Sequence, residues 1–521
     1  IPIGTGEWYW NATRIIPHLG NESGPITEFP FFTFLYGDLH AHMLALPVTL
    51  AAIAWSIAVV FGARRTRSVT ASVVHWSFGA IVIGSLAAIN TWDYPTYLFI
   101  GCCAILWPYF ITRDNNENVR LIDCIGNVCL FVILATLCFL PYSIWYGSSY
   151  TKLQIWHGSK TPIMAYFQVH GLFLFLVVGL LVGETRDWVR NRYNNLLSYR
   201  NRSVDILFLG GLIPAMIIGL VLFISGVVIA PVVLAIVVWS IALMVIPDQS
   251  VAKRICFGLT SVGLLLSLFV EFIRLDGDIG RMNTVFKFYL QIWTLFSVVA
   301  GVALAWLIGE INNWNKISRI VWSGSLLALI LASISYTFLA IPAKSRDRMA
   351  IANPAGLDGM EFMRYANYHD QGQLISLNAD YDAIRWMQDN VKGSPVIVEA
   401  NTPEYRFGSR YSIYTGLPGV IGWNWHQRQQ RAAAPSNLVT DRVEEVKEFY
   451  LNVDIDKTVT FLDRYAVRYI VVGEYEIAYY HVDGMDKFRQ MVGMGLLDIA
   501  YENDSVVIYS YNKNMSDVRI D

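Results

Sequence analysis

The sequence predicts a polytopic α-helical membrane protein that carries a C-terminal α/β domain. Of its 521 residues 55% are hydrophobic and 15% charged, and the mean hydropathy of +0.41 is too apolar for a soluble chain of this length. Near residue 343 the long apolar runs give way to alternating helix and strand patterns. We therefore divide the chain into an outer loop segment (1–41), a transmembrane domain (42–342) and an external α/β domain (343–521).

Ten apolar runs follow one another in the transmembrane part, and we expect each to be one membrane helix. Basic loops, such as residues 64–67 and 186–202, separate alternate pairs of runs and are predicted to be cytoplasmic. This orientation predicts a multi-pass protein of the plasma membrane with its C-terminal domain outside the cell. The runs are 43–62, 73–88, 97–111, 121–140, 163–183, 206–226, 227–246, 255–273, 284–308 and 320–342.

The external domain shows helix and strand patterns in alternation. A strand, a turn and a strand are expected to close the chain as a hairpin, at residues 497–501 and 506–511. The earlier elements are an amphipathic helix at 380–390, a buried strand at 394–400, a helix at 458–465 and a strand at 467–472.

Charge and cysteine content exclude some classes of protein. The formal net charge is −2, so there is no basic excess that would favour a nucleic-acid partner. All six cysteines fall inside apolar runs, so the external domain needs no disulfide. The first residues have the composition of a loop and no initiator Met precedes them, so we expect earlier helices to be missing.

A short Asp-x-His-x-His motif stands directly before the first membrane helix, at its outer end. Asp38, His40 and His42 alternate along the chain, so Asp38 and His40 converge on one cation if the backbone there is extended. Carboxylate and imidazole suit Zn, Mn or a similar divalent ion. The alternative interpretation is an interfacial loop whose polar groups cap the helix.

Charged residues cluster between the eighth and ninth runs. A charge at helix depth costs about 2.5–3.5 kcal/mol on insertion scales, so several together predict pairing or a water-filled cavity. Arg281 and Lys287 are candidates for binding the phosphate of an anionic head group. In the alternative, Glu271 pairs with Lys287 or with Arg281 and pins two helices together. The two interpretations do not exclude each other.

The external domain contains one segment that is dense in Trp, Tyr, His and Arg, at residues 406–431. Aromatic faces beside Arg, Gln and Asn suit a sugar or sugar-phosphate site. Its candidate acceptor-binding residues are Trp423, Trp425, His426 and Arg428. The alternative is a surface loop that packs on the membrane interface through its two Trp side chains.

Six motifs resemble the YYY family, a group of uncharacterised archaeal and Chloroflexus-type membrane proteins, over nearly the whole chain. They are EFPFFTFLYGDLHAH, NTWDYPTY, RMNTVFKFYLQ, GLDGMEFM, TGLPGVIGWNWHQRQQR and DRYAVRYIVVGEYE. Members of that family usually carry more helices before the EFPFF motif. The family is remotely similar to the GT-C superfamily, whose members take a sugar from a polyprenyl-phosphate carrier at the outer membrane face.

The resemblance implies a divalent metal cofactor (Mn, Mg or Zn) and a polyprenyl-phosphate sugar. Asp38-x-His40 is similar to the second metal motif of oligosaccharyltransferase-like members, and the first acid of such a site would lie in the missing helices. Residues 422–426 are similar in placement to the Trp-rich acceptor motif of those enzymes, but they lack its Asp.

We therefore expect a GT-C-like glycosyltransferase at the extracytoplasmic face. A metal held by Asp38 and His40, with His42 as a further candidate ligand, would neutralise the leaving phosphate. Asp93 or Glu28 would deprotonate the acceptor hydroxyl. The alternative is a non-catalytic subunit of a larger membrane assembly, whose partner is a further membrane subunit or the N-terminal half. A transporter is less favoured, because the charges gather at the outer edge and transport sites lie near the bilayer midplane.

Overall fold

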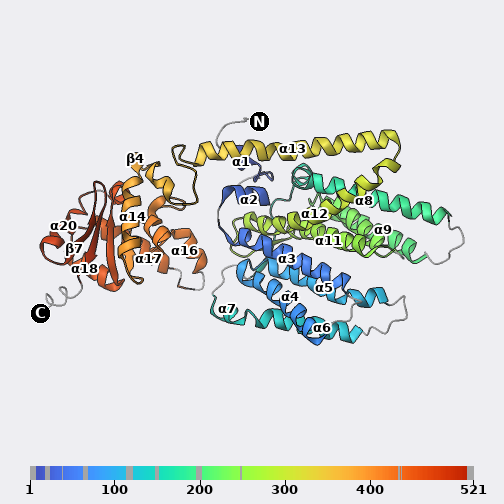
Figure 1. Cartoon of the computed structure of the whole chain (residues 1–521), viewed down its shortest axis with the longest axis horizontal. Helices are drawn as coiled ribbons and strands as arrows, with labels where there is room; N and C mark the ends of the chain where they lie inside the picture. Colours follow the sequence, from blue (N-terminus) through green and yellow to red (C-terminus); the bar gives the residue numbers. More distant parts are fainter. Residues whose placement is uncertain are drawn as a thin grey trace. The chain divides into compact units, whose positions relative to one another are not determined.

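The computed structural model describes residues 8–17, 24–37, 39–62, 68–112, 121–146, 152–194, 202–246, 249–431, 434–435, 437–480 and 482–512. These residues belong to two compact units, which meet in the chain between Ala343 and Lys344. We call them the membrane unit and the C-terminal unit, and Figure 1 shows them in blue to yellow and in orange to red.

All ten predicted apolar runs are helical in the membrane unit. Its long helices are α3 (Ala41–Phe61), α4 (Val69–Ile89), α5 (Asp93–Thr112), α6 (Leu121–Leu137), α8 (Ile163–Asn194), α9 (Arg202–Ile224), α10 (Ala230–Met244), α11 (Val251–Phe269), α12 (Met282–Glu310) and α13 (Lys316–Arg348). Short elements lie before and between them: α1 (Trp8–Asn11), α2 (Pro30–Tyr36), α7 (Leu140–Trp145), β1 (Leu153–Ile155), β2 (Ile273–Leu275) and η2 (Ile311–Asn313). The expected outer loop segment thus holds two short helices.

Six of the described helices are long and apolar enough to cross a membrane, namely α3, α4, α8, α11, α12 and α13. The prediction of ten spans is therefore supported for six. Among the others, α6 and α10 are shorter apolar helices of 17 and 15 residues. At about 1.5 Å per residue such helices fall short of a hydrocarbon core of about 30 Å.

Two groups of helices make up most of the membrane unit. Helices α3 to α6 pack against one another in the first group, and α8 to α12 in the second. Figure 1 shows the first group in blue and cyan and the second in green and yellow-green. Helix α12 also contacts α3 and α5, and α11 contacts α3, so these helices join the two groups.

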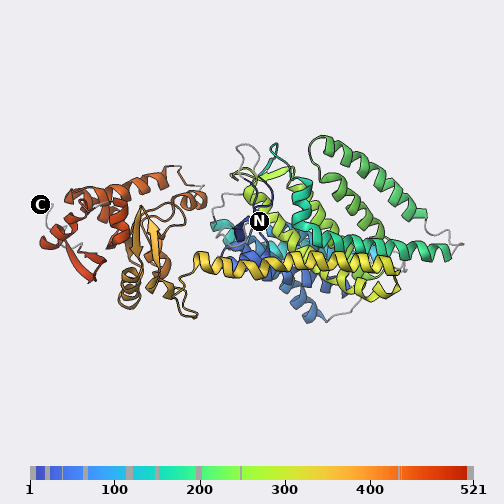
Figure 2. The same ribbon diagram turned by 90° about the horizontal axis from the view of Figure 1, so that it is seen from above.

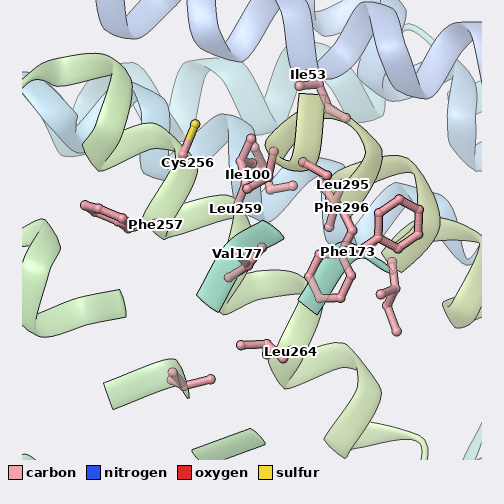
Figure 3. Close-up of a cluster of buried hydrophobic side chains, with 14 of the residues drawn as sticks. Ile53, Ile100, Phe173, Val177, Cys256, Phe257, Leu259, Leu264, Leu295 and Phe296 are labelled. Atoms are coloured by element: carbon pink, nitrogen blue, oxygen red, sulfur yellow. The ribbon is translucent and has the colours of Figure 1, made fainter. Parts of the chain in front are cut away.

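One hydrophobic core runs through the junction of the two groups. Buried Ile53 of α3 lies in one cluster with Phe173 of α8 and Leu295 of α12, as Figure 3 shows. Ile100 of α5 and Phe257 of α11 belong to the same cluster. Close packing of this kind holds the polar side chains at the helix ends in fixed positions.

Residues 90–96, which lie between the second and third apolar runs, include the first turn of α5. Helix α4 ends at Ile89 with Asn90 as its C-cap, and α5 begins at Asp93 after a turn of two residues. A carboxylate is favourable at the first turn of a helix, because the helix dipole places positive charge there. Asp93 is 5% exposed and so lies inside the membrane unit.

Helix α13 has far less packing than the other spans. Only 11% of its apolar window is buried, against 28–50% for the other five. Figure 2 shows it in yellow as a long helix. Near its C-terminal end, Tyr336 donates a hydrogen bond of 2.8 Å to the Tyr9 carbonyl and packs edge-on against Phe29. In a membrane the rest of its surface is free to face lipid.

The C-terminal unit contains a four-stranded mixed sheet in the order β5-β6-β8-β7. Its strands are β5 (Val396–Val398), β6 (Val467–Val472), β7 (Leu497–Glu502) and β8 (Val507–Tyr511). The pair β5–β6 is parallel, and the pairs β6–β8 and β7–β8 are antiparallel. The predicted C-terminal hairpin and the strand at 467–472 are therefore confirmed.

Helices cover both faces of this sheet. Alternate strand residues face opposite sides, so Ile470 packs with α17 (Leu438–Leu451), α18 (Ile455–Arg464) and α20 (Asp486–Gly493), and Val471 packs with α14 (Asn378–Asn390). This three-layer arrangement confirms the predicted helices at 380–390 and 458–465. The remaining elements are η3 (Glu361–Arg364), β3 (Asn367–Asp370), β4 (Gln373–Ser376), η4 (Phe407–Ser409), α15 (Arg410–Thr415), α16 (Asn424–Gln430) and α19 (Glu474–Tyr480).

Candidate functional site

Four ionisable side chains from four different segments gather where the two helix groups meet. They are Glu28, which precedes α2; His42 at the start of α3; Asp93, the first residue of α5; and Lys287 in the second turn of α12. We call this set the junction site. The sequence separates its members by as many as 259 residues, since 287 − 28 = 259, so only packing brings them together.

Glu28 and His42 form one half of the junction site. His42 Nε2 lies 3.3 Å from Glu28 Oε1, and the two side chains are 11% and 14% exposed. Thr33 donates a second hydrogen bond of 2.7 Å to the same carboxylate oxygen. The His42 ring also packs edge-on against Phe286, at 4.7 Å between centroids, beside Lys287 in the chain. Glu28 is thus engaged in orienting His42.

Asn90 links the other two members of the site. Its amide Nδ2 donates to Asp93 Oδ2 at 3.0 Å, and its Oδ1 accepts a long bond of 3.4 Å from Lys287 Nζ. Lys287 and His42 also attract the Asp93 carboxylate electrostatically. No carboxylate of the described residues forms an ion pair with the Lys287 ammonium. An acid and a cation therefore lie close together without direct pairing.

An unsatisfied polar atom lies on the same side of α12 as Lys287, one turn further along the helix. Gln291 Nε2 donates a hydrogen bond of 3.0 Å to the carbonyl of Trp92, next to Asp93. Its Oε1 is buried and has no hydrogen-bond partner among the residues that the structure describes. A buried acceptor of this kind costs free energy unless a ligand or water donates to it.

Arg281 adopts the alternative arrangement, an ion pair with Glu271. Its Nη1 lies 2.7 Å from Glu271 Oε1 and also donates to the Val270 carbonyl at 3.0 Å, and both charged side chains are fully buried. Its Nη2 donates to Thr161 Oγ1 at 3.0 Å, while the Thr161 amide donates to Glu271 Oε2 at 2.9 Å. The pair pins the segment before α8 to the α11–α12 connection. Both Nη atoms of the guanidinium are occupied in this way.

The predicted metal motif is only partly described. Asp38 lies outside the described residues, while His40 is the exposed N-cap residue of α3. The His40 and His42 rings are 5.9 Å apart between centroids. Among the described residues there is no group of three His, Cys, Asp or Glu side chains placed to hold a metal ion. The described donors do not form a metal site, so we derive no chemical step through a metal.

The four predicted acceptor-binding residues diverge in the C-terminal unit. Trp423 and His426 form an aromatic cluster with Tyr405, with ring centroids 5.4–5.5 Å apart. Trp425 is exposed, and Arg428 donates to Thr440 Oγ1 at 3.0 Å, which ties α16 to α17. The structure thus brings two of the four together and adds Tyr405, whose positive φ of 65° no sequence pattern signals.

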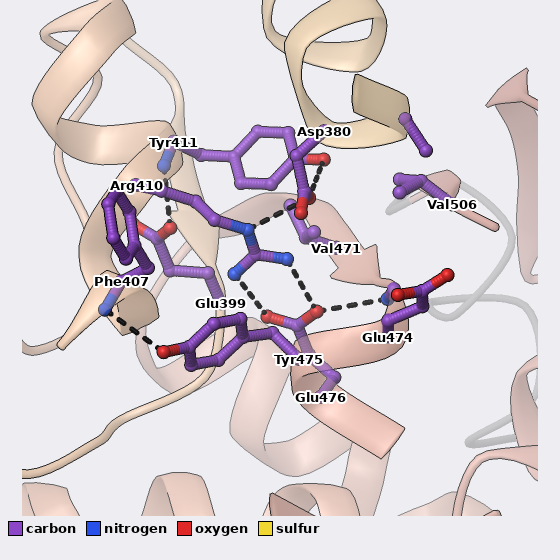
Figure 4. A network of polar contacts seen from close by, with 12 residues as sticks. Asp380, Glu399, Phe407, Arg410, Tyr411, Val471, Glu474, Tyr475, Glu476 and Val506 are labelled. Atoms are coloured by element: carbon purple, nitrogen blue, oxygen red, sulfur yellow. Dashed lines mark hydrogen bonds and ion pairs between the residues drawn. The ribbon is translucent and has the colours of Figure 1, made fainter. Parts of the chain in front are cut away.

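A buried ionic network, missed in the sequence, holds the C-terminal unit together (Figure 4). The guanidinium of Arg410 is fully buried and binds both carboxylate oxygens of Glu476, at 3.1 and 2.9 Å. Its Nε lies 2.8 Å from Asp380 Oδ1. Burial raises the pKa of Asp380, and the Arg410 charge opposes that shift. The network joins α14, α15 and α19 and is structural in character.

A second buried acid, Glu399, lies beside this network. It accepts hydrogen bonds from the Tyr411 amide at 2.8 Å and from the Ser412 amide at 2.9 Å. Burial raises the pKa of Glu399 to about 7, although the bonds from Ser412 favour the charged form. This carboxyl therefore titrates near neutral pH.

The apolar helices, the buried ion pair and the junction site define a multi-pass membrane protein with ionisable groups inside its helical bundle. Residues 2–296 match a family described as an uncharacterized membrane protein family, DUF2298, and the chain belongs to this family. The match covers all four members of the junction site and stops within α12. The expected membership of an uncharacterised membrane family is thus confirmed, whereas the likeness to the GT-C superfamily gains no support. No curated protein matches the chain.

Proposed function

We propose that this protein binds the phosphate of a polyprenyl-phosphate-linked sugar at the junction site and transfers the sugar to an acceptor hydroxyl. The observation that carries the proposal is the Lys287 ammonium, which is half-buried in α12 beside Asp93 but forms no ion pair with a described carboxylate. A cation held in apolar surroundings is stabilised by an anionic ligand. A lipid phosphate supplies that charge and reaches the site from the bilayer.

In this proposal the residues at the junction site have separate roles in the reaction. Lys287 binds the phosphate and stabilises the negative charge that develops as the bond between the sugar carbon and the phosphate oxygen breaks. Asp93 accepts the proton of the acceptor hydroxyl while the acceptor oxygen forms the new bond to that carbon. The lipid phosphate leaves with the electron pair of the broken bond. Asn90 holds the acid and the cation in one hydrogen-bonded chain.

The choice between the two candidate bases follows from their contacts. Glu28 Oε1 already accepts a hydrogen bond from Thr33 and faces His42 Nε2. The Asp93 carboxylate accepts a hydrogen bond from Asn90 and lies next to the phosphate-binding lysine. We therefore assign proton transfer to Asp93 and the orientation of His42 to Glu28.

Acceptor recognition belongs, in this proposal, to the aromatic cluster of Tyr405, Trp423 and His426. Ring faces at this spacing stack on the apolar face of a sugar. The positive-inside orientation adds that the transfer takes place at the extracytoplasmic face of the plasma membrane.

Lipid binding in nanodiscs tests the proposal. We would measure the affinity of the purified full chain for a polyprenyl monophosphate and for the neutral polyprenol. Lys287→Gln should weaken phosphate binding by about tenfold or more, since a charge-assisted hydrogen bond is lost, and should leave polyprenol binding unchanged. The matched control is Lys316→Gln, which removes an exposed lysine at the start of α13.

Two further measurements separate binding from transfer. Asp93→Asn should keep lipid binding but abolish sugar transfer from a polyprenyl-phosphate sugar. Equal affinity of the parent and of Lys287→Gln for the lipid phosphate would refute the junction site. Normal lipid binding without transfer by the parent chain would instead support the non-catalytic subunit.

A further inference from the structure

A polar cavity lies in the C-terminal unit, largely within the segment 406–431 but apart from the four candidate acceptor-binding residues. Its volume is about 200 Å³, and its walls come from α15, the segment after it, α16 and α17. The polar lining consists of Ser409, Ser412, Gln427, Arg431 and Arg442. Val420 and Val439 are buried and add an apolar part to the wall. The cavity is not lined by the Trp side chains of that segment.

The two arginines of this cavity keep their charge available to a ligand. Arg431 Nη1 donates to the neutral Gln427 Oε1, and Arg442 Nη1 donates to the Val420 carbonyl at 3.3 Å. Arg442 also stacks over the Tyr465 ring, 5.3 Å from its centroid. In the part of the chain that the structure describes, neither arginine forms an ion pair with a carboxylate. Two guanidinium groups thus surround one cavity without a compensating acid in contact.

The nearest acid behind the cavity wall is turned to other partners. Ser412 Oγ donates a hydrogen bond of 2.5 Å to Glu399, whose other oxygen accepts from the Tyr411 amide. Glu399 is 5% exposed and does not line the cavity. The field inside the cavity is therefore set mainly by Arg431 and Arg442.

Two glycines let the backbone approach the cavity closely. A Cβ on Gly419 would lie 2.8 Å from Ser412 Oγ, and a Cβ on Gly422 would lie 2.9 Å from Gln427 Nε2. Side chains at these positions would push polar lining groups out of place. The cavity wall between α15 and α16 therefore requires glycine at both positions.

We propose that this cavity binds a sugar-sized ligand that carries one phosphate or carboxylate group. Guanidinium forks match the paired oxygens of either anion. The serine hydroxyls and the Gln427 amide suit the hydroxyl groups of a sugar, and Val420 and Val439 suit its apolar face. The volume suits one ring rather than an oligosaccharide. This site is independent of the lipid phosphate proposed at Lys287.

Calorimetry on the full chain in nanodiscs tests this proposal with four probes: glucose 1-phosphate, glucuronate, glucose and inorganic phosphate. We expect at least one of the two charged sugars to bind about tenfold or more tightly than glucose. The charged sugar that binds more tightly shows whether the site prefers a phosphate or a carboxylate, and either result supports the site. Inorganic phosphate should bind more weakly than glucose 1-phosphate, because it lacks the ring contacts.

Matched variants tie the binding to the cavity. Arg442→Gln and Arg431→Gln should each lower the affinity for the charged sugar by about tenfold. Lys447→Gln is the control, because it removes an exposed positive charge from α17 outside the cavity. Arg431 is exposed and makes no buried contact, so its variant keeps the test valid if Arg442→Gln unfolds.

Three outcomes would overturn the inference: equal affinity for glucose and for both charged sugars, unchanged affinity in both arginine variants, or loss of the binding in Lys287→Gln. The last would place the ligand in the membrane unit. If Lys287→Gln keeps sugar binding but loses the binding of the lipid phosphate, the two sites are separate.

Discussion

Two cations of the membrane unit, the buried Arg281 and the half-buried Lys287, have opposite kinds of surroundings. Arg281 is paired with Glu271, and Thr161 and Val270 make further hydrogen bonds to the pair, while Arg281 Nε has no hydrogen-bond partner among the described residues. Lys287 has a single long bond to a neutral amide. A satisfied pair stabilises packing, whereas an unpaired cation is suited to bind a ligand. The contrast between these two residues is the basis of our assignment.

Removing one partner of the satisfied pair should be costly. Arg281→Met leaves the Glu271 carboxylate buried without its counter-charge, so we expect a loss of about 3–5 kcal/mol in the free energy of unfolding. Denaturation of the detergent-solubilised protein measures it. The double variant Arg281→Met with Glu271→Gln should lose less, because no uncompensated charge remains. A double variant as unstable as the sum of both single variants would show that the two residues act separately.

The buried acid Glu399 should make the local stability of the C-terminal unit depend on pH. Its pKa is about 7 in the folded chain against 4.5 for an ordinary Glu, so the folded state holds the proton more tightly than the unfolded state. The free energy of local opening should therefore fall as the pH rises from about 4.5 to about 7, by at most about 1.4 kcal/mol per pH unit. Hydrogen exchange of the Tyr411 and Ser412 amides, corrected for intrinsic rates, measures this.

The matched variant for this pH effect is Glu399→Gln. An amide at this position cannot ionise, so the slope with pH should disappear. Its NH2 group would face the Tyr411 amide, so the stability should also be lower at every pH. An unchanged slope in the variant would assign the effect to another acid, of which Asp380 is the nearest candidate.

At the level of elements, close helix packing in the membrane unit depends on particular glycines. Gly79 of α4 lies directly against the Trp55 ring of α3, and a Cβ there would overlap that ring. The Trp55 indole also donates a hydrogen bond of 3.0 Å to the His75 carbonyl one turn away. Small residues of this kind let membrane helices approach each other.

Gly79→Ala should destabilise the α3–α4 pair by about 1–3 kcal/mol, since the Trp55 ring must move. Gly126→Ala in α6 is the matched control, because a Cβ there meets no atom within 4 Å. The control should be neutral or more stable, as Ala favours a helix by up to about 1 kcal/mol over Gly. Thermal unfolding in detergent compares the two. Equal effects of both changes would mean that α4 does not pack on Trp55 as described.

At the level of the whole molecule, the open prediction is the orientation in the membrane. The positive-inside rule places the C-terminal unit outside the cell and the α12–α13 connection inside. In intact cells, a membrane-impermeant maleimide should label Asp504→Cys in the β7–β8 turn and should not label Asn312→Cys. Permeabilised cells should show labelling of both. The reverse pattern in intact cells would invert the orientation and place the proposed transfer in the cytoplasm.

The sequence alone was enough to predict the apolar helices, six of which are long enough to cross a membrane, and the hairpin β7–β8, because both depend on local patterns. Apolar runs partition into a bilayer segment by segment, and strands alternate along their own length. Local patterns predicted the ends of a helix less well where those ends depended on packing. The start of α5 is one such case, since Asp93 lies before the predicted apolar run 97–111 but is buried as the first residue of the helix.

Tertiary structure decided which charges meet. The sequence left two interpretations of Arg281, a phosphate-binding residue or a partner of Glu271, and in the structure it forms the ion pair with Glu271. Lys287 lies beside Asp93, which belongs to a helix far away in the chain. The Arg410 network and the arginine cavity likewise join segments far apart in the chain. Hydrophobicity acts on each segment by itself, whereas an ion pair or a binding site requires atoms from different segments within about 3–4 Å. Only the folded chain settles which segments come that close.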